Sequence, residues 1–197
     1  MTDFAFDKKI ICPEDPTATA GRVKQYGEYY RVKYDICREI RPVFRIAEIG
    51  VRAGYSAWAF LQAAPAARYQ GYDSGGTRHG GFKGALDWAA RILRPYDTQL
   101  FRIDTQRMNA LPGLDADLVD LFHVDGDHSE AGTMHDLELA YHHTRPGGRI
   151  LVDDITYIDG VKRAAAKFIN KMVGRVTAEF RPSLRGEMII TKTGVTV

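Results

Sequence analysis

Two apolar segments of this sequence end abruptly in acidic residues. Residues 118–124 (LVDLFHV) are followed by Asp125, and residues 149–152 (RILV) are followed by Asp153 and Asp154. If both segments are parallel strands, their carboxyl ends meet at one edge of the sheet, where α/β proteins build their sites. Three carboxylates in one place repel each other unless a cation lies between them. The sequence therefore predicts that Asp125, Asp153 and Asp154 bind a cation.

The chemistry of such a site follows from its ligands. Oxygen ligands favour a hard cation, with Mg²⁺ first and Mn²⁺ or Ca²⁺ as alternatives. Adjacent strand residues point to opposite faces, so Asp153 and Asp154 can both be ligands if the chain turns there. A bound cation lowers the pKa of a coordinated hydroxyl, and His128, with an unperturbed pKa of about 6.5, is a candidate general base for its proton. The alternative interpretation is a polar loop in which Asp127 or Ser129 caps the next helix.

A second group of glycine and acidic residues follows an earlier apolar segment, residues 43–49. Gly50 and Gly54 let the backbone approach a ligand closely, and the helix that follows presents free N–H groups. The spacing matches neither the dinucleotide fingerprint nor the nucleotide triphosphate loop. Asp73, at the end of the next predicted strand, can accept hydrogen bonds from both hydroxyls of a ribose. The pattern predicts a site for a nucleoside without phosphates; the alternative is that the glycines shape a turn and Asp73 caps a helix.

These residues need a framework that places several strand ends side by side. Apolar periodicity and chain breakers predict alternating helices and strands, with the Pro146-Gly147-Gly148 segment stopping the fourth helix. The pattern predicts an α/β fold with a doubly wound, seven-stranded, mostly parallel sheet, a C-terminal antiparallel strand and helices on both faces. The expected helices are 18–41, 54–64, 82–94, 129–143 and 158–173, and the expected strands are 43–49, 69–73, 99–104, 118–124, 149–154, 176–182 and 187–192.

The composition limits the classes of partner. The 197 residues, 45% hydrophobic and 26% charged, are typical of a single globular domain (1–197). A net charge of +2 without long basic runs gives no indication of nucleic acid binding. The sequence lacks a bilayer-length apolar segment and a signal-peptide core, so we expect no membrane association. Cys12 and Cys37 lie in no CxxC motif, which favours a reduced, cytoplasmic protein. The sequence does not determine the oligomeric state, and a homodimer is compatible with it.

Four segments, in this order and spacing, resemble the class I S-adenosylmethionine-dependent methyltransferases: EIGVRAGYS (48–56), YQGYDS (69–74), FHVDGDHS (122–129) and PGGRILVDD (146–154). They are most similar to the small metal-dependent O-methyltransferases of the catechol and caffeoyl-CoA type and to their bacterial sugar-modifying relatives. The resemblance covers about residues 43–160. It implies a Rossmann-like core (43–197) behind an N-terminal helical segment (1–42), S-adenosylmethionine as the cofactor, Mg²⁺ as the most suitable divalent cation and a small hydroxylated molecule as the acceptor.

The resemblance also implies roles for individual residues. Asp125, Asp153 and Asp154 match the metal ligands of the family. Two positions depart from its pattern, since Asp154 stands where the best-known relatives have asparagine and His128 where they commonly have a basic lysine. The cofactor residues that the resemblance implies are Glu48, Gly50 and Gly54 for the methionine part with Ser56 close by, Asp73 for the ribose, Asp104 near the adenine and Asp127 as a candidate at the amino end.

Two other classes of function remain as alternatives. The first is a cofactor-binding domain without transfer activity that serves as a regulatory or assembly partner. The second is a metal-dependent hydrolase, because HVDGDH resembles the HxHxDH loop of binuclear zinc hydrolases with Asp125 in place of the middle histidine. The alternation of helices and strands and the pair Glu48 and Asp73 argue against the hydrolase.

Overall fold

The seven strands expected from the sequence form one sheet. The computed structural model describes residues 4–77, 80–116 and 118–194. The strand order is β3-β2-β1-β4-β5-β7-β6. The strands are β1 (Arg45–Ile49), β2 (Arg68–Asp73), β3 (Thr98–Arg102), β4 (Val119–Val124), β5 (Thr144–Val152), β6 (Val176–Arg181) and β7 (Glu187–Lys192). The helices are α1 (Ala20–Glu39), α2 (Tyr55–Ala63), α3 (Ala85–Leu93), α4 (Glu130–His143) and α5 (Asp159–Lys171), with short 3-10 helices at Lys8–Ile10 and Thr105–Arg107.

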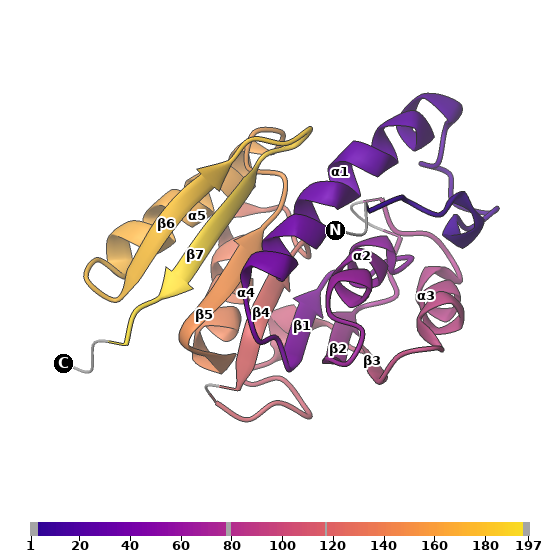
Figure 1. The fold of residues 1–197 in the computed structure, drawn as a ribbon. Coiled ribbons are helices and arrows are strands. Elements are labelled where there is room, and N and C mark those ends of the chain that lie inside the picture. Colours follow the sequence, from indigo (N-terminus) through magenta and orange to yellow (C-terminus); the bar gives the residue numbers. More distant parts are fainter. Residues whose placement is uncertain (1–3, 78–79, 117, 195–197) are drawn as a thin grey trace.

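The topology is that of a doubly wound, Rossmann-like sheet. Strands β1 to β5 pair in parallel, whereas β7 runs antiparallel to both of its neighbours, β5 and β6. Parallel neighbours need crossover connections, and α2, α3 and α4 lie in those that join β1 to β2, β2 to β3 and β4 to β5, while α5 connects β5 to β6. The β6–β7 hairpin lies at one end of the sheet and α3 at the other (Figure 1). The predicted fold class is confirmed.

Each face of the sheet has its own apolar cluster. Successive strand residues point to opposite faces, so β1 places Ile46 in one cluster and Ala47 in the other. Strand β4 does the same with Leu121 and Phe122. The first cluster joins the sheet to α1, α2 and α3, and the second joins it to α4 and α5. Both faces of the central strands β1 and β4 are therefore covered, so a ligand can approach them at their ends.

Helix α1 buries a face that is largely aromatic. Its side of the first cluster includes Tyr26, Tyr29, Tyr30 and Tyr34. Lys33 lies on the same face and is buried to 1% exposure. Since a lysine is almost never fully buried unless it is paired, its position indicates a specific partner in the interior.

Strand β5 differs from its prediction at both ends. It begins at Thr144, directly after α4, and includes the Pro146-Gly147-Gly148 segment that was expected to precede it. The pairing register with β4 shifts there, and Gly147 has a φ of +76°, so the segment is accommodated as an irregularity inside the strand. At its other end β5 stops at Val152, which places Asp153 and Asp154 just beyond the strand.

The amino edge of the sheet depends on Asp120, which is 3% exposed. One of its carboxylate oxygens accepts hydrogen bonds from the backbone N–H groups of Phe44 and Arg45, both at 2.8 Å, and the other accepts one from Arg145. We expect Asp120→Ala to lower the free energy of unfolding by about 3 kcal/mol, because it leaves these donors without their acceptor. Urea denaturation measures this, with the exposed Asp97→Ala as control. A loss no larger than that of the control would contradict the prediction.

No helix in the described ranges is long and apolar enough to cross a membrane. The division of residues 1–197 into a helical segment and a core remains a prediction, and residues 1–3 and 195–197 lie outside the part of the chain that the structure describes.

Candidate active site

The carboxyl ends of β1, β2, β3 and β4 surround one cavity of about 960 Å³. Helix α1 and the loop between β6 and β7 contribute to the opposite wall through Tyr29 and Arg185. Seven of the residues predicted from the sequence line this cavity: Gly50, Ser56, Asp73, Asp104, Asp125, Asp127 and His128. Glu48, Gly54, Asp153 and Asp154 are not among the described residues that line it.

Gly50 brings the first turn into contact with the end of β4. Its φ is +92°, and a Cβ atom at this position would lie 1.9 Å from the backbone oxygen of Asp125. Its N–H donates to the carbonyl of Tyr72 at 2.9 Å, and the N–H of Asp125 donates to Ile49 at 2.9 Å. The absence of a side chain therefore lets two predicted parts of the site, the glycine turn and the acidic strand end, touch each other.

Glu48 lies beneath this turn, fully buried. Its carboxylate accepts hydrogen bonds from the hydroxyls of Ser56 and Tyr69 and lies 2.7 Å from Nδ1 of His123. Glu48 thus fixes the rotamer of Ser56, which lines the cavity. Gly54 is the N-cap residue of α2 with a φ of +78°, and its close neighbour is Ala89, so it serves the packing of α2 against α3.

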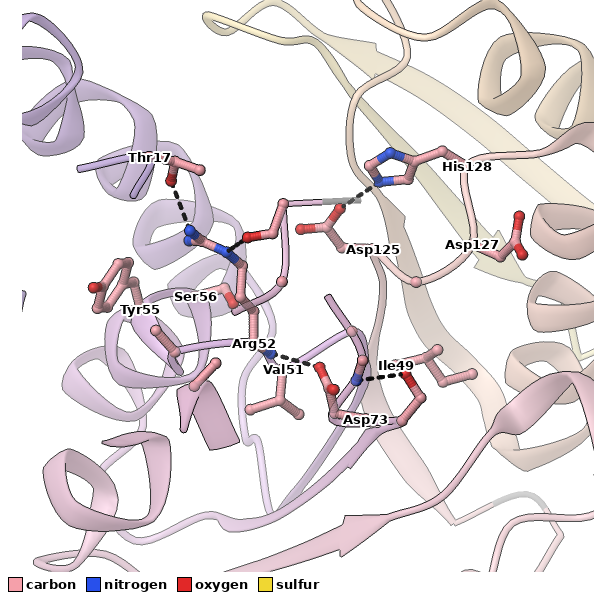
Figure 2. Close-up of a pocket in the computed structure, with 18 of the residues that line it drawn as sticks. Thr17, Ile49, Val51, Arg52, Tyr55, Ser56, Asp73, Asp125, Asp127 and His128 are labelled. Atoms are coloured by element: carbon pink, nitrogen blue, oxygen red, sulfur yellow. Dashed lines mark hydrogen bonds and ion pairs between the residues drawn. The ribbon is translucent and has the colours of Figure 1, made fainter. Parts of the chain in front are cut away.

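Asp73 is held at the cavity wall by backbone groups. It accepts hydrogen bonds from the N–H of Arg52 at 2.7 Å and from that of Gly75 at 2.6 Å. The Arg52 guanidinium extends away from it to Asp15, to Thr17 and to the carbonyl of Gly80 (Figure 2 shows the contact with Thr17). Arg52 was not predicted from the sequence. It connects the segment before α1, the first turn and the loop after β2 around one side of the cavity.

Asp104 and Asp127 line the cavity while they also stabilise local turns. Asp104 accepts a hydrogen bond from the N–H of Gln106 at 3.2 Å. Asp127 accepts one from the N–H of Ser129 at 2.7 Å, and the Ser129 hydroxyl accepts one from Gly132 at the start of α4. The capping role considered as an alternative for this segment is therefore present. In Figure 2 the Asp127 carboxylate points away from Asp125.

His128 lies between two of the predicted acids. Its Nε2 atom is 3.4 Å from Asp125 and 3.6 Å from Asp154 (Figure 2 shows the first contact). The three side chains offer ligand atoms within 4.8 Å of one another. The hydrogen bond with Asp125 raises the pKa of His128 against the opposing effect of burial. Burial, together with Asp125 and Asp153, raises the pKa of Asp154 to about 6. This cluster can hold a proton or a cation.

The structure divides the three predicted metal ligands between two groups. The chain turns at Asp154, whose φ is +61°, as joint ligation would require, but the two acids fall in different groups of potential ligands. Asp154 joins Asp125 and His128, whereas Asp153 lies in a group with His123 and Asp125. Asp153 is also bonded to Tyr29 and Lys33 of α1. The sequence analysis missed the role of Lys33, although a lysine among the aromatic residues of the predicted helix 18–41 was a usable signal.

The strand order, the glycine turn after β1 and the acid at the end of β2 together define a class I methyltransferase. A family model described as a methyltransferase domain matches residues 47–155. The chain belongs to this methyltransferase family. This confirms the class expected from the four sequence segments.

Solved structures with the same fold share little sequence identity with this chain. The O-methyltransferase TomG from Streptomyces achromogenes, in complex with SAM, is 20% identical over 85% of this chain and 81% of that chain, with a TM-score of 0.61. The O-methyltransferase from Bacillus cereus in complex with SAH is 14% identical over 91% and 84%, with a TM-score of 0.61. A protein described as a putative rRNA-methylase from Clostridium thermocellum is 14% identical over 86% and 98%, with a TM-score of 0.66. No curated protein matches the sequence.

Proposed function

We propose that this protein transfers a methyl group from S-adenosylmethionine to a hydroxyl of a small molecule. The observation that carries the proposal is the contact between Gly50 and Asp125, which joins two halves of one cavity. The donor half contains Ser56, Asp73 and Asp104, and the acceptor half contains Asp125 and His128. Similar structures in complex with SAM and SAH support the choice of cofactor.

The donor half suits a nucleoside joined to an amino acid. Asp73 has both oxygens oriented by backbone N–H groups, and its remaining lone pairs can accept hydrogen bonds from the two ribose hydroxyls. Gly50 and Ser56 lie where the methionine part would enter the first turn, and Asp104 lies at the end of the third strand, where the adenine would be. Asp127 stays the candidate for the amino group.

The acceptor half suits the deprotonation of a hydroxyl. The acceptor oxygen attacks the methyl carbon in line, the carbon–sulfur bond breaks, and S-adenosylhomocysteine leaves with the electron pair on sulfur. His128 takes the hydroxyl proton at Nε2, and Asp125 and Asp154 stabilise the imidazolium that results. Holding the two reactants in this geometry supplies much of the rate enhancement.

A divalent cation is part of this proposal. Asp125 and Asp154 would provide two carboxylates for a divalent ion, while His128, whose Nε2 must keep its lone pair to take the proton, lies beside the ion and is not a ligand. When bound, such an ion lowers the pKa of the acceptor hydroxyl. Mg²⁺ or Mn²⁺ suits the carboxylates best.

A small acceptor is favoured over nucleic acid by charge and by cavity size. The net charge is +2, and the cavity of about 960 Å³ is within the range for small-molecule sites, roughly 300–1,000 Å³. We also propose that the protein is cytoplasmic, that its two cysteines are reduced, and that it has no nucleic acid or membrane partner. One similar structure is described as a putative rRNA-methylase. RNA is therefore the first alternative acceptor to compare with small hydroxylated molecules in the transfer assay.

Calorimetry with S-adenosylhomocysteine tests the core of the proposal. We expect binding in the micromolar range, because the ligand fills the donor half.

A methyl-transfer assay with small hydroxylated acceptors then distinguishes the enzyme from a cofactor-binding domain without transfer activity, which would bind S-adenosylhomocysteine but show no turnover. Absence of binding at millimolar ligand would exclude the proposed function, and zinc in the purified protein without cofactor binding would favour a hydrolase.

Removal of the cation should reduce turnover while sparing cofactor affinity. We expect EDTA to lower the rate of methyl transfer by roughly 100-fold and added Mg²⁺ to restore it. The affinity for S-adenosylhomocysteine serves as the control and should change less than about twofold, because the donor half contains no cation ligand. Full activity in EDTA would show that His128 and its two acids suffice without a cation.

A further inference from the structure

Helix α1 contributes a buried, positively charged side chain, Lys33, next to the acceptor half of the cavity. The ammonium of Lys33 lies 2.9 Å from Asp153 and 2.6 Å from Glu187 at the start of β7. The Lys33 side chain is 1% exposed and both carboxylates are fully buried. A pair so deep in the interior is costly to separate, because the partner left behind would be an uncompensated buried charge.

Both oxygens of Asp153 already have partners. Oδ1 accepts a hydrogen bond from the N–H of Asp154 at 2.8 Å. Oδ2 accepts hydrogen bonds from the Lys33 ammonium and from the Tyr29 hydroxyl. A divalent ion on Asp153 would have to displace Lys33 or lie close to its positive charge, and a mutual repulsion of this kind is strong in a buried environment.

The protonation states agree with this geometry. Burial alone would lower the pKa of Lys33, but Asp153 and Glu187 raise it above its usual value, so the ammonium keeps its charge. Burial acts to raise the pKa of Asp153, but Lys33 holds it below its usual range. Burial, with Asp153 close by, raises the pKa of Glu187 to about 8. These directions follow from the short contacts of the Lys33 ammonium with Asp153 and Glu187.

Asp154 has a different kind of partner. Arg185, from the loop between β6 and β7, donates to it at 3.1 Å and 3.3 Å, but the Arg185 side chain is 26% exposed. Arg185 can move into solvent without disturbing the core, whereas Lys33 cannot leave unless α1 separates from the sheet. Asp154 is itself 1% exposed, so an ion can reach it only when Arg185 moves aside, and the buried Lys33 gives Asp153 no such route.

We infer that Lys33 is a built-in cation for Asp153, so that this pair anchors α1 to the acceptor half and Asp153 does not bind the divalent ion. That ion would be held by Asp125 and Asp154, next to His128, a part of the inference that rests on the proposed function. Lys33 is therefore a positioning residue for α1 and does not touch the reacting groups. It holds in place the helix whose Tyr29 forms part of the cavity wall.

Mn²⁺ titration by calorimetry on the full chain tests the inference without an activity assay. We expect Asp153→Asn to bind Mn²⁺ within about threefold of wild type and Asp154→Asn to bind it at least tenfold more weakly. Lys33→Gln, which keeps a hydrogen-bond donor but removes the charge, should bind Mn²⁺ at least tenfold more tightly than wild type, because Asp153 loses its internal cation. Lys24→Met, at an exposed position of the same helix, is the control.

Thermal unfolding supplies the second measurement. We expect Lys33→Met to lower the melting temperature by roughly 10 °C and the double variant Lys33→Met, Asp153→Asn to recover at least half of this loss. The double variant removes both charges of the pair, so it remains informative if Lys33→Met does not fold. A melting temperature of Lys33→Met equal to that of Lys24→Met would overturn the inference.

The outcomes separate this inference from the proposed function. Loss of Mn²⁺ binding in a folded Asp153→Asn variant would overturn the inference and leave a metal-dependent function intact. If wild type binds no Mn²⁺, the proposed cation is wrong, and the inference is then decided by Lys33→Gln. A new Mn²⁺ site in that variant supports the inference, and its absence overturns it.

Discussion

Gly50→Ala is expected to remove both stable folding and cofactor binding. The new Cβ would lie 1.9 Å from the carbonyl oxygen of Asp125 and 2.4 Å from its carbonyl carbon. These are backbone atoms held by pairing between β1 and β4, so they cannot rotate away as the end of a side chain can. The φ of +92° adds strain for any residue other than glycine. We expect a loss of more than about 4 kcal/mol in the free energy of unfolding.

A second glycine of the same conformation separates the clash from the strain. Gly84 precedes α3 with a φ of +85°, and a Cβ there would have no heavy atom within 4 Å. Gly84→Ala should therefore cost about 1–2 kcal/mol, the strain alone. Urea denaturation of both variants, with calorimetry for S-adenosylhomocysteine, gives the comparison. Equal losses in the two variants would show that the contact between the first turn and Asp125 is not essential.

Asp73→Asn is expected to weaken S-adenosylhomocysteine binding by about 100-fold. An ionised carboxylate can accept hydrogen bonds from both ribose hydroxyls, and hydrogen bonds to a charged group contribute about 1.5–3 kcal/mol each. The amide keeps one oxygen, and its NH₂ group must face the N–H of Arg52 or Gly75. The variant therefore loses both an acceptor and the orientation that the backbone gives to the side chain.

The matched control for this substitution is Asp87→Asn, an exposed change on α3. We expect it to leave the calorimetric affinity unchanged within about twofold. The melting temperature of Asp73→Asn without ligand distinguishes weakened binding from partial unfolding of the first turn. A folded Asp73→Asn variant that binds within threefold of wild type would remove Asp73 from the cofactor site.

The order of elements could be predicted because local patterns encode it. Apolar periodicity and breakers predicted every α-helix and strand to within a few residues, with the exception of β5, but not the two short 3-10 helices. There the segment Pro146-Gly147-Gly148 is typical of a break, but pairing with β4 continues on both sides of it. The positions of Asp73 and Asp125 followed from one further fact, that parallel strands end at the same edge. Both side chains line the cavity.

The partners of the site residues could not be predicted in the same way. The contact of Lys33 with Asp153 depends on where α1 crosses the sheet, and that of Arg185 with Asp154 depends on the β6–β7 hairpin. Both pair residues that are far apart in the sequence, and no local pattern specifies them. The left-handed conformation of Asp154, with a φ of +61°, was likewise not specified by a local pattern.

The position of β7 between β5 and β6 has a consequence for how the chain folds as it is synthesised. Strand β6 precedes β7 in the sequence but, among the described strands, pairs with β7 alone, so it has no place in the sheet until β7 has been made. The donor half of the cavity uses residues between Gly50 and Asp127, whereas Arg185 and Glu187 are synthesised later, with the β6–β7 hairpin. Since a domain generally folds as a unit, we expect the sheet to be completed, and Lys33 to gain both of its partners, only after the whole hairpin has been synthesised.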